Sequence, residues 1–157
     1  MPDWITHILV AWTTCTLLSF KFKQFNRENT VIVMIGSLIP DIFKIYIPLE
    51  LLGIYAQDII MPIHLPIGSL IMAAIISLFF KEKKTIFLFL IFGVFTHFAL
   101  DSLLTYVSGG MLLLFPFSWQ TWQLKIIPID DYNIMILALF LAVLVYFVSW
   151  KKGKSVK

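Results

Sequence analysis

The chain has 157 residues, of which 60% are hydrophobic, 16% aromatic and 13% charged. Soluble domains are about 45–50% apolar and about 25% charged. A chain of this length encloses too little interior to hide so many apolar side chains from water, so an ordinary soluble domain is excluded. The net charge of +3 comes without a basic, aromatic patch for nucleic acid, and the single cysteine, Cys15, excludes an internal disulfide.

The apolar residues fall in continuous runs, which predict an all-α integral membrane bundle. In chain order, one domain covering residues 1–157 is expected to have helices over residues 5–20, 30–48, 61–80, 85–107 and 132–150. We expect the second helix to be broken near Pro40, because a proline ring interrupts helical hydrogen bonds. The first run has no basic start and no small-residue cleavage pattern, so it is expected to remain in the mature protein.

Ten of the twelve basic residues lie between the first and second helices, between the third and fourth, or after the fifth. With five crossings these places share one side of the membrane, and basic residues mark the cytoplasmic side. We therefore expect a multi-pass protein with its N-terminus outside and its C-terminus in the cytoplasm. The outer segment 108–131 is rich in glycine and tryptophan, and is expected to be an irregular lid or an interfacial belt.

All three histidines and two aspartates lie inside or beside the apolar runs. These residues are His7, Asp41, His64, His97 and Asp101. Counted from the basic edge of its helix, each lies 13 to 17 positions away. At about 1.5 Å per residue, this places all of them roughly 20 to 25 Å from the basic side, near the outer end of the bundle. His97 and Asp101 are also four positions apart, so they share one helix face.

Ionisable residues inside a membrane are costly and usually functional. Imidazole and carboxylate groups are ligands that Zn²⁺ and other divalent ions prefer. With Asp101 as a bridge, the group would hold one or two ions, zinc being favoured, and leave positions open for water and substrate. The sequence therefore predicts a metal site formed by His7, Asp41, His64, His97 and Asp101, of which Asp101, His64 and Asp41 are the predicted catalytic residues.

Other interpretations of these residues stay open. The same polar groups could form hydrogen bonds between helices, carry protons or metal in a coupled transporter, or hold a structural metal in a scaffold without activity. Lys44 would either steady a phosphate or extend to the membrane interface. The hydroxyls of Ser102, Thr105 and Tyr106 would either orient the ligands or bond to their own helix.

Several short motifs carry a family resemblance. They are Thr6-His7, Gly36-Ser37-Leu38-Ile39-Pro40-Asp41, His64-Leu65-Pro66-Ile67-Gly68-Ser69, Thr96-His97 with Leu100-Asp101, and Phe115-Pro116-Phe117-Ser118. In this order they resemble the membrane-bound metal-dependent hydrolases of the YdjM and YbcI type, over about residues 1 to 120. The resemblance implies a metal-dependent hydrolase in a prokaryotic plasma membrane.

The ligand order also has a more distant likeness. The succession His, Asp, His and then His-x-x-x-Asp is similar to that of the zinc-dependent bacterial phospholipase C enzymes, which cleave phosphodiesters at a metal cluster. This is an analogy of chemistry only. Together with the outer position of the residues, it predicts hydrolysis of a phosphoester such as a lipid head group or lipid-linked phosphate, with membrane lipids as partners.

Overall fold

The structure, a computed structural model, describes residues 3–105, 110–127 and 131–153, the last range with side chains from Asn133 onward. Its helical elements are α1 (Trp4–Ser19), α2 (Arg27–Leu38), the 3₁₀ helix η1 (Pro40–Ile45), α3 (Tyr46–Leu51), α4 (Gln57–Ile60), the 3₁₀ helix η2 (Met61–His64), α5 (Pro66–Ser77), α6 (Lys83–Ser102) and α7 (Asp131–Lys151). Among the described residues the only β-type pairings are two isolated bridges. The all-α prediction is confirmed.

The helices long and apolar enough to cross a membrane are Lys83–Ser102 and Asn133–Lys151, within the described part of the chain. Two bent pairs raise this number to four if each pair forms one span: Arg27–Leu38 with Pro40–Leu51, and Gln57–His64 with Pro66–Ser77. The apolar α1 has 16 residues, fewer than the roughly 20 that cross a hydrocarbon core. The expected count of five helices therefore differs from the structure, because two of the apolar runs are broken.

Prolines set both breaks. The predicted break near Pro40 is confirmed, since α2 ends at Leu38 and η1 begins at Pro40, with a bend of 50° between the two parts. The continuous helix predicted over residues 61–80 is wrong, because the chain bends by 90° before Pro66. Leu65 has extended backbone angles there (φ −80°, ψ 148°), which is the conformation that a following proline favours.

The outer segment packs across the end of α6. The helix therefore ends at Ser102 and not at the predicted residue 107. The backbone N–H of Leu124 donates to the carbonyl of Ser102 at 2.8 Å, and that of Ile127 donates to Leu103 at 3.0 Å. Between residues 110 and 127 the chain is irregular as predicted, whereas the remainder of the expected segment includes residues 108–109 and 128–130, which lie outside the described residues. The choice between a lid and a belt stays a prediction.

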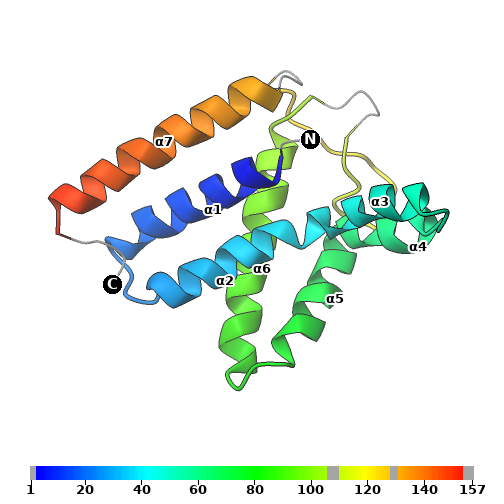
Figure 1. Ribbon diagram of the computed structural model, residues 1–157, viewed down its shortest axis with the longest axis horizontal. Coiled ribbons are helices and arrows are strands. Elements are labelled where there is room, and N and C mark those ends of the chain that lie inside the picture. The colour runs from blue at the N-terminus through cyan, green and yellow to red at the C-terminus, as the bar shows by residue number, and fades with distance from the viewer. Residues whose placement is uncertain (1–2, 106–109, 128–130, 154–157) are drawn as a thin grey trace.

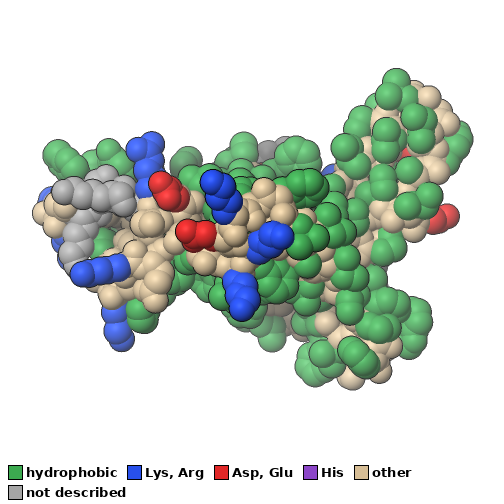
Figure 2. Space-filling view, turned by 90° about the horizontal axis from the view of Figure 1, so that it is seen from below, with side chains coloured by type: hydrophobic (Ala, Val, Ile, Leu, Met, Phe, Trp, Pro, Cys, Tyr) green, Lys and Arg blue, Asp and Glu red, His purple; other side chains and the backbone are tan. Residues whose placement is uncertain are grey.

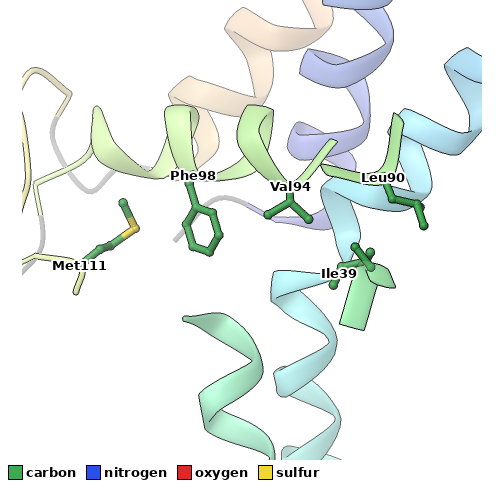
Figure 3. Packing of buried hydrophobic residues seen from close by; sticks show 6 residues of the cluster. Ile39, Leu90, Val94, Phe98 and Met111 are labelled. Carbon is green, nitrogen blue, oxygen red and sulfur yellow. The ribbon is translucent and has the colours of Figure 1, made fainter. Parts of the chain in front are cut away.

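The long helix α6 lies at the centre of the bundle. It packs against α1, α2 and α5, and α1 lies between α2 and α7 (Figure 1). Buried apolar side chains from α5, α6, the outer segment and the residue that follows α2 form one cluster along α6 (Figure 3). Its members are Ile39, Ala73, Leu90, Val94, Phe98 and Met111. The cluster fixes the outer half of α6 against the end of α2.

Two glycines bring the backbones of α2 and α6 into contact. A Cβ atom on Gly36 would lie 2.3 Å from the carbonyl oxygen of Leu90, and one on Gly93 would lie 2.1 Å from that of Val33. Small residues allow such close approach of helices in membranes. The contact therefore fixes the spacing of the two helices just before the turn that carries Asp41.

The basic residues gather at the turns and ends predicted from the sequence. Figure 2, viewed toward the α5–α6 turn, shows Lys and Arg side chains over this turn and over the end where α1 and α2 are joined. The end of α7 reaches this second place, because Lys152 Nζ lies 4.8 Å from the centre of the Phe20 ring. The opposite end of the bundle holds the buried histidines and aspartates.

The glycine contact predicts the effect of a single methyl group. Gly93→Ala would force α2 and α6 apart, and we expect a loss of about 1–3 kcal/mol of stability from overpacking. Leu88→Ala on the exposed side of the same helix should change stability much less. Thermal unfolding of the purified protein in detergent measures both, and equal stability of Gly93→Ala and the unchanged chain would contradict the contact.

Candidate metal centre

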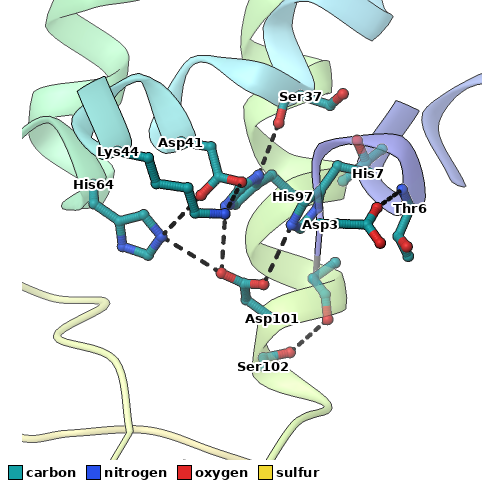
Figure 4. Close-up of polar contacts among 12 residues, drawn as sticks. Asp3, Thr6, His7, Ser37, Asp41, Lys44, His64, His97, Asp101 and Ser102 are labelled. Atoms are coloured by element: carbon teal, nitrogen blue, oxygen red, sulfur yellow. Dashed lines mark hydrogen bonds and ion pairs between the residues drawn. The ribbon is translucent and has the colours of Figure 1, made fainter. Parts of the chain in front are cut away.

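The predicted site residues meet at one point, although they come from four separate elements (Figure 4). His7 lies on α1, Asp41 on η1 and His64 on η2, while His97 and Asp101 lie on α6. Their ligand atoms form two overlapping groups, and within each group the atoms lie within 4.8 Å of one another. One group is His7, His97 and Asp101, and the other is Asp41, His64 and His97. The structure thus brings together every residue of the predicted set.

The start of α1 positions His7. Asp3 caps the helix, since its carboxylate accepts a hydrogen bond of 2.7 Å from the backbone N–H of Thr6. His7 follows in the first turn, is 1% exposed, and stacks on His97 with 3.8 Å between the ring centres. A short, capped helix start therefore delivers an imidazole directly to the centre.

The end of α2 positions both Asp41 and His97. Because Gly36 and Gly93 let the helices touch, the carbonyl oxygen of Ser37 lies 2.8 Å from His97 Nδ1. A carbonyl oxygen only accepts hydrogen bonds, so Nδ1 must be the protonated nitrogen of the ring. The lone pair of His97 Nε2 is then free to face the centre, as is usual for a metal-binding histidine.

The bend before α5 positions His64. Ser69 on α5 donates a hydrogen bond of 2.6 Å to the carbonyl of Ile63. A Cβ atom on Gly68 would lie 2.1 Å from the carbonyl oxygen of Pro62, so only glycine allows the two arms of the bend to approach this closely. The His64–Ser69 motif is thus a structural unit that turns one imidazole back toward α6.

The two oxygens of Asp101 face different histidines. Oδ1 lies 3.6 Å from His7 Nε2, and Oδ2 lies 3.6 Å from His64 Nε2 and 3.3 Å from His97 Nε2. Asp41 Oδ1 lies 4.0 Å from His64 Nε2. Two ligands of one tetrahedral zinc ion, each about 2.0–2.1 Å from the metal, lie about 3.3 Å apart. The spacing therefore suits atoms that share an ion, and the position of Asp101 suits a bridge.

The inward-facing atoms have no hydrogen-bond partners among the residues that the structure describes. They are His7 Nε2, His64 Nε2, His97 Nε2, Asp41 Oδ1, Asp101 Oδ1 and Asp101 Oδ2. Buried polar atoms are almost always hydrogen-bonded, because an unpaired one costs about 1–3 kcal/mol and a charged one more. The interpretation that these groups only bond helix to helix therefore leaves the centre unsatisfied, whereas a divalent cation would be a partner for all of them.

Lys44 turns toward the centre, and its ammonium group lies 2.6 Å from Asp41 Oδ2. Lys44 is therefore paired with a residue of the centre, and the choice between its two predicted roles stays a prediction. Its side chain is 24% exposed and that of His64 is 17% exposed, whereas those of His7, His97 and both aspartates are at most 1% exposed. The centre is therefore reached from the side of Lys44 and His64.

Aromatic rings surround His64 and limit the water around it. The centre of the Phe43 ring lies 4.7 Å from that of the His64 ring, and the centre of the Phe98 ring lies 5.9 Å from it, both edge to face.

Of the predicted orienting hydroxyls, Ser102 donates to the carbonyl of Ala99 in its own helix, and Tyr106 lies outside the described residues. The role of the Ser37 carbonyl could not be predicted, because a backbone atom carries no residue-type signature.

Comparison with known families agrees with the motifs. The family described as YdjM inner membrane protein matches residues 1–156. The chain belongs to this family. It is accordingly a membrane protein, and membrane lipids are its surroundings. No curated protein and no solved structure matches the chain.

The geometry predicts how metal affinity depends on Asp101. Asp101→Asn removes the carboxylate that faces all three histidines, and we expect zinc affinity to fall by more than the roughly 10–100-fold typical of outer-shell changes. Asp58→Asn, an exposed aspartate on α4, is the matched control and should bind zinc normally. Titration calorimetry and elemental analysis of the purified proteins measure this, and equal zinc content in both variants would contradict the site.

Proposed function

We propose that the protein is a membrane-bound metal-dependent hydrolase that acts on a phosphoester, such as a lipid head group or lipid-linked phosphate. The observation that carries the proposal is the set of buried, inward-facing nitrogen and oxygen atoms that have no hydrogen-bond partner in the described part of the chain. They belong to residues whose ligand atoms lie within 4.8 Å of one another. This donor set, with both imidazole and carboxylate groups, is typical of zinc and other divalent ions.

The five residues of the centre would hold one or two divalent ions, zinc being the favoured one. Such an ion activates water at neutral pH and neutralises charge that develops on a phosphoryl oxygen. Asp41 and His64 lie at the accessible edge and are the residues of the chain best placed to contact a substrate. Lys44 would bind the anionic oxygens of that substrate, because an ammonium is a point-charge partner for phosphate.

A lipid substrate is supported by what lies beside the centre. An open, mainly apolar groove of about 440 Å³ runs between α5 and α6, with Pro66, Leu70, Phe95 and Phe98 in its walls. Phe98 also contacts the rings of His64 and His97. An acyl chain in this groove would place its head group next to the metal ligands.

The proposed orientation follows the basic residues. With the turns that carry them in the cytoplasm, the N-terminus and the metal centre lie toward the outer face, and the C-terminus lies in the cytoplasm. The membrane would be a prokaryotic plasma membrane. A substrate head group in the outer leaflet would then lie at the depth of the centre.

Transport of protons or metal by the same residues is the rival function. A carrier needs polar groups that lead across the membrane. Among the described residues, the histidines and acids that are buried all belong to the centre: His7, Asp41, His97 and Asp101. The other buried polar side chains are hydroxyls, which favours an enzyme open to one side.

Hydrolysis of a chromogenic phosphodiester by the purified protein tests the proposal. We expect activity that a chelator removes and zinc restores, and that falls about 100-fold or more in Asp101→Asn, since the metal contributes several kcal/mol to transition-state stabilisation. Asp58→Asn should keep the activity. Zinc uptake into liposomes that Asp101→Asn abolishes, without hydrolysis, would instead establish a carrier. A loss of thermal stability as the sole effect would indicate a scaffold.

Lys44 offers a separate test of phosphate binding. Lys44→Met removes a charge-assisted contact worth about 1.5–3 kcal/mol, so we expect kcat/KM for the phosphodiester to fall about tenfold or more. Lys44→Arg keeps the cation and should retain most of the activity, and both variants should bind zinc. Lys23→Met, which removes a cation at the basic end, is the control. Unchanged kinetics in Lys44→Met would contradict this role.

A further inference from the structure

A second concave site lies at the basic end of the bundle, away from the metal centre. Here α1, α2 and α7 enclose a hollow of about 450 Å³. Its walls include the only arginine of the chain, aromatic rings and hydroxyls. These side chains are Arg27, Trp12, Thr30, Tyr146, Ser149 and Trp150. None of them belongs to the metal centre.

Arg27 carries a positive charge with no partner among the described residues. It is exposed at the first position of α2, after the capping residue Asn26, and makes no ion pair with any described acid. Two neighbouring cations do have partners, since Lys21 lies over the ring of Phe22 and Lys152 over the ring of Phe20. The guanidinium is thus the cation available inside the hollow, and it can bind phosphate through two parallel hydrogen bonds.

Two of the hydroxyls in the hollow, those of Thr30 and Ser149, are already engaged as donors. Thr30 donates to the carbonyl of Asn26 at 2.7 Å, and Ser149 donates to that of Tyr146 at 2.8 Å. They therefore add no donors for an anion. Among the charged groups of the described residues, Arg27 alone lines the hollow, so a ligand would be recognised by one guanidinium at one end.

The polarity of the walls of the hollow changes along α2. From Arg27 to Met34 it extends about 10 Å, at about 1.5 Å per residue. Beyond the first turn its walls are apolar or aromatic, with Val31, Met34 and Trp12. A free phosphate would use only the charged mouth, whereas a phospholipid has an anionic head followed by an apolar chain. The graded polarity therefore matches a lipid and not an inorganic anion.

We propose that this hollow is a binding site for an anionic phospholipid of the leaflet at the basic end. The lipid phosphate pairs with Arg27, and the adjoining part of an acyl chain lies against Trp12, Val31 and Met34. Trp150 and Tyr146 border the head group, where aromatic residues commonly sit in membrane proteins. Basic pockets between helices are known to hold anionic head groups. The site is independent of the proposed hydrolase activity.

Native mass spectrometry of the purified protein in detergent tests this proposal. The protein is titrated with short-chain phosphatidylglycerol and, separately, with phosphatidylcholine of the same chain length, and the affinity for each lipid is measured. We expect phosphatidylglycerol to bind about fivefold tighter or more, the preference that one interfacial cation provides. Arg27→Gln should abolish the preference. Lys23→Gln removes the same charge at the same end but does not line the hollow, and should retain it.

Val31→Trp fills the hollow without changing its charge, and should weaken binding of both lipids even if Arg27→Gln proves unstable. An equal loss of preference in Lys23→Gln and Arg27→Gln would overturn the proposal, because it would indicate general attraction to a basic surface. Inorganic phosphate that binds as tightly as phosphatidylglycerol would also overturn it, in favour of a free-anion site. Tight binding of phosphatidylglycerol by Val31→Trp would contradict the acyl-chain contact.

Discussion

Acidic and imidazole side chains are buried together where no hydrogen-bond partner among the described residues satisfies their inward-facing atoms. Burying a polar atom without a partner is unfavourable, and burying an unpaired charge is much more so. The protein nevertheless brings these groups from four elements to one place. A divalent cation is the one simple ligand that would compensate both carboxylates and accept the nitrogen lone pairs at once. The rest of the fold can be understood as the means of holding these groups in position.

Three local structural features produce this placement. The paired glycines of α2 and α6 let the helices touch, which aligns the Ser37 carbonyl with His97. Pro40 ends α2 and begins the 3₁₀ turn that carries Asp41. The bend before Pro66 turns His64 back toward α6. Each of these features relies on glycine or proline, and each sets the position of one or two ligands.

Much of this centre could be predicted from the sequence, because the depth of a residue in the membrane depends mainly on how many residues separate it from the end of its helix. The distances from the basic turns placed His7, Asp41 and His97 at one level, and the one-turn spacing placed Asp101 beside His97. The break at Pro40 is predictable for a different reason, since a proline ring interrupts the hydrogen bonds of a helix. These features depend on local chemistry and on the thickness of the bilayer.

Other features depend on contacts between distant segments, which a single sequence does not reveal. The bend at Leu65 was missed because hydrophobicity is continuous across Pro66, and only packing against α6 selects a bend over a tilted helix. The direction of Lys44 depends on whether Asp41 or the interface is the nearer partner. The early end of α6 results from the return of residues 124–127 to its last carbonyls, a long-range pairing without a motif.

The proposed activity requires a metal in the space between Asp101 and the histidines. An X-ray structure of the protein purified with zinc, with anomalous data collected at both sides of the zinc absorption edge, measures this directly. We predict one or two anomalous peaks about 2.0–2.2 Å from Asp101 and from the Nε2 atoms that face it. Well-ordered side chains around a position without anomalous signal would contradict it.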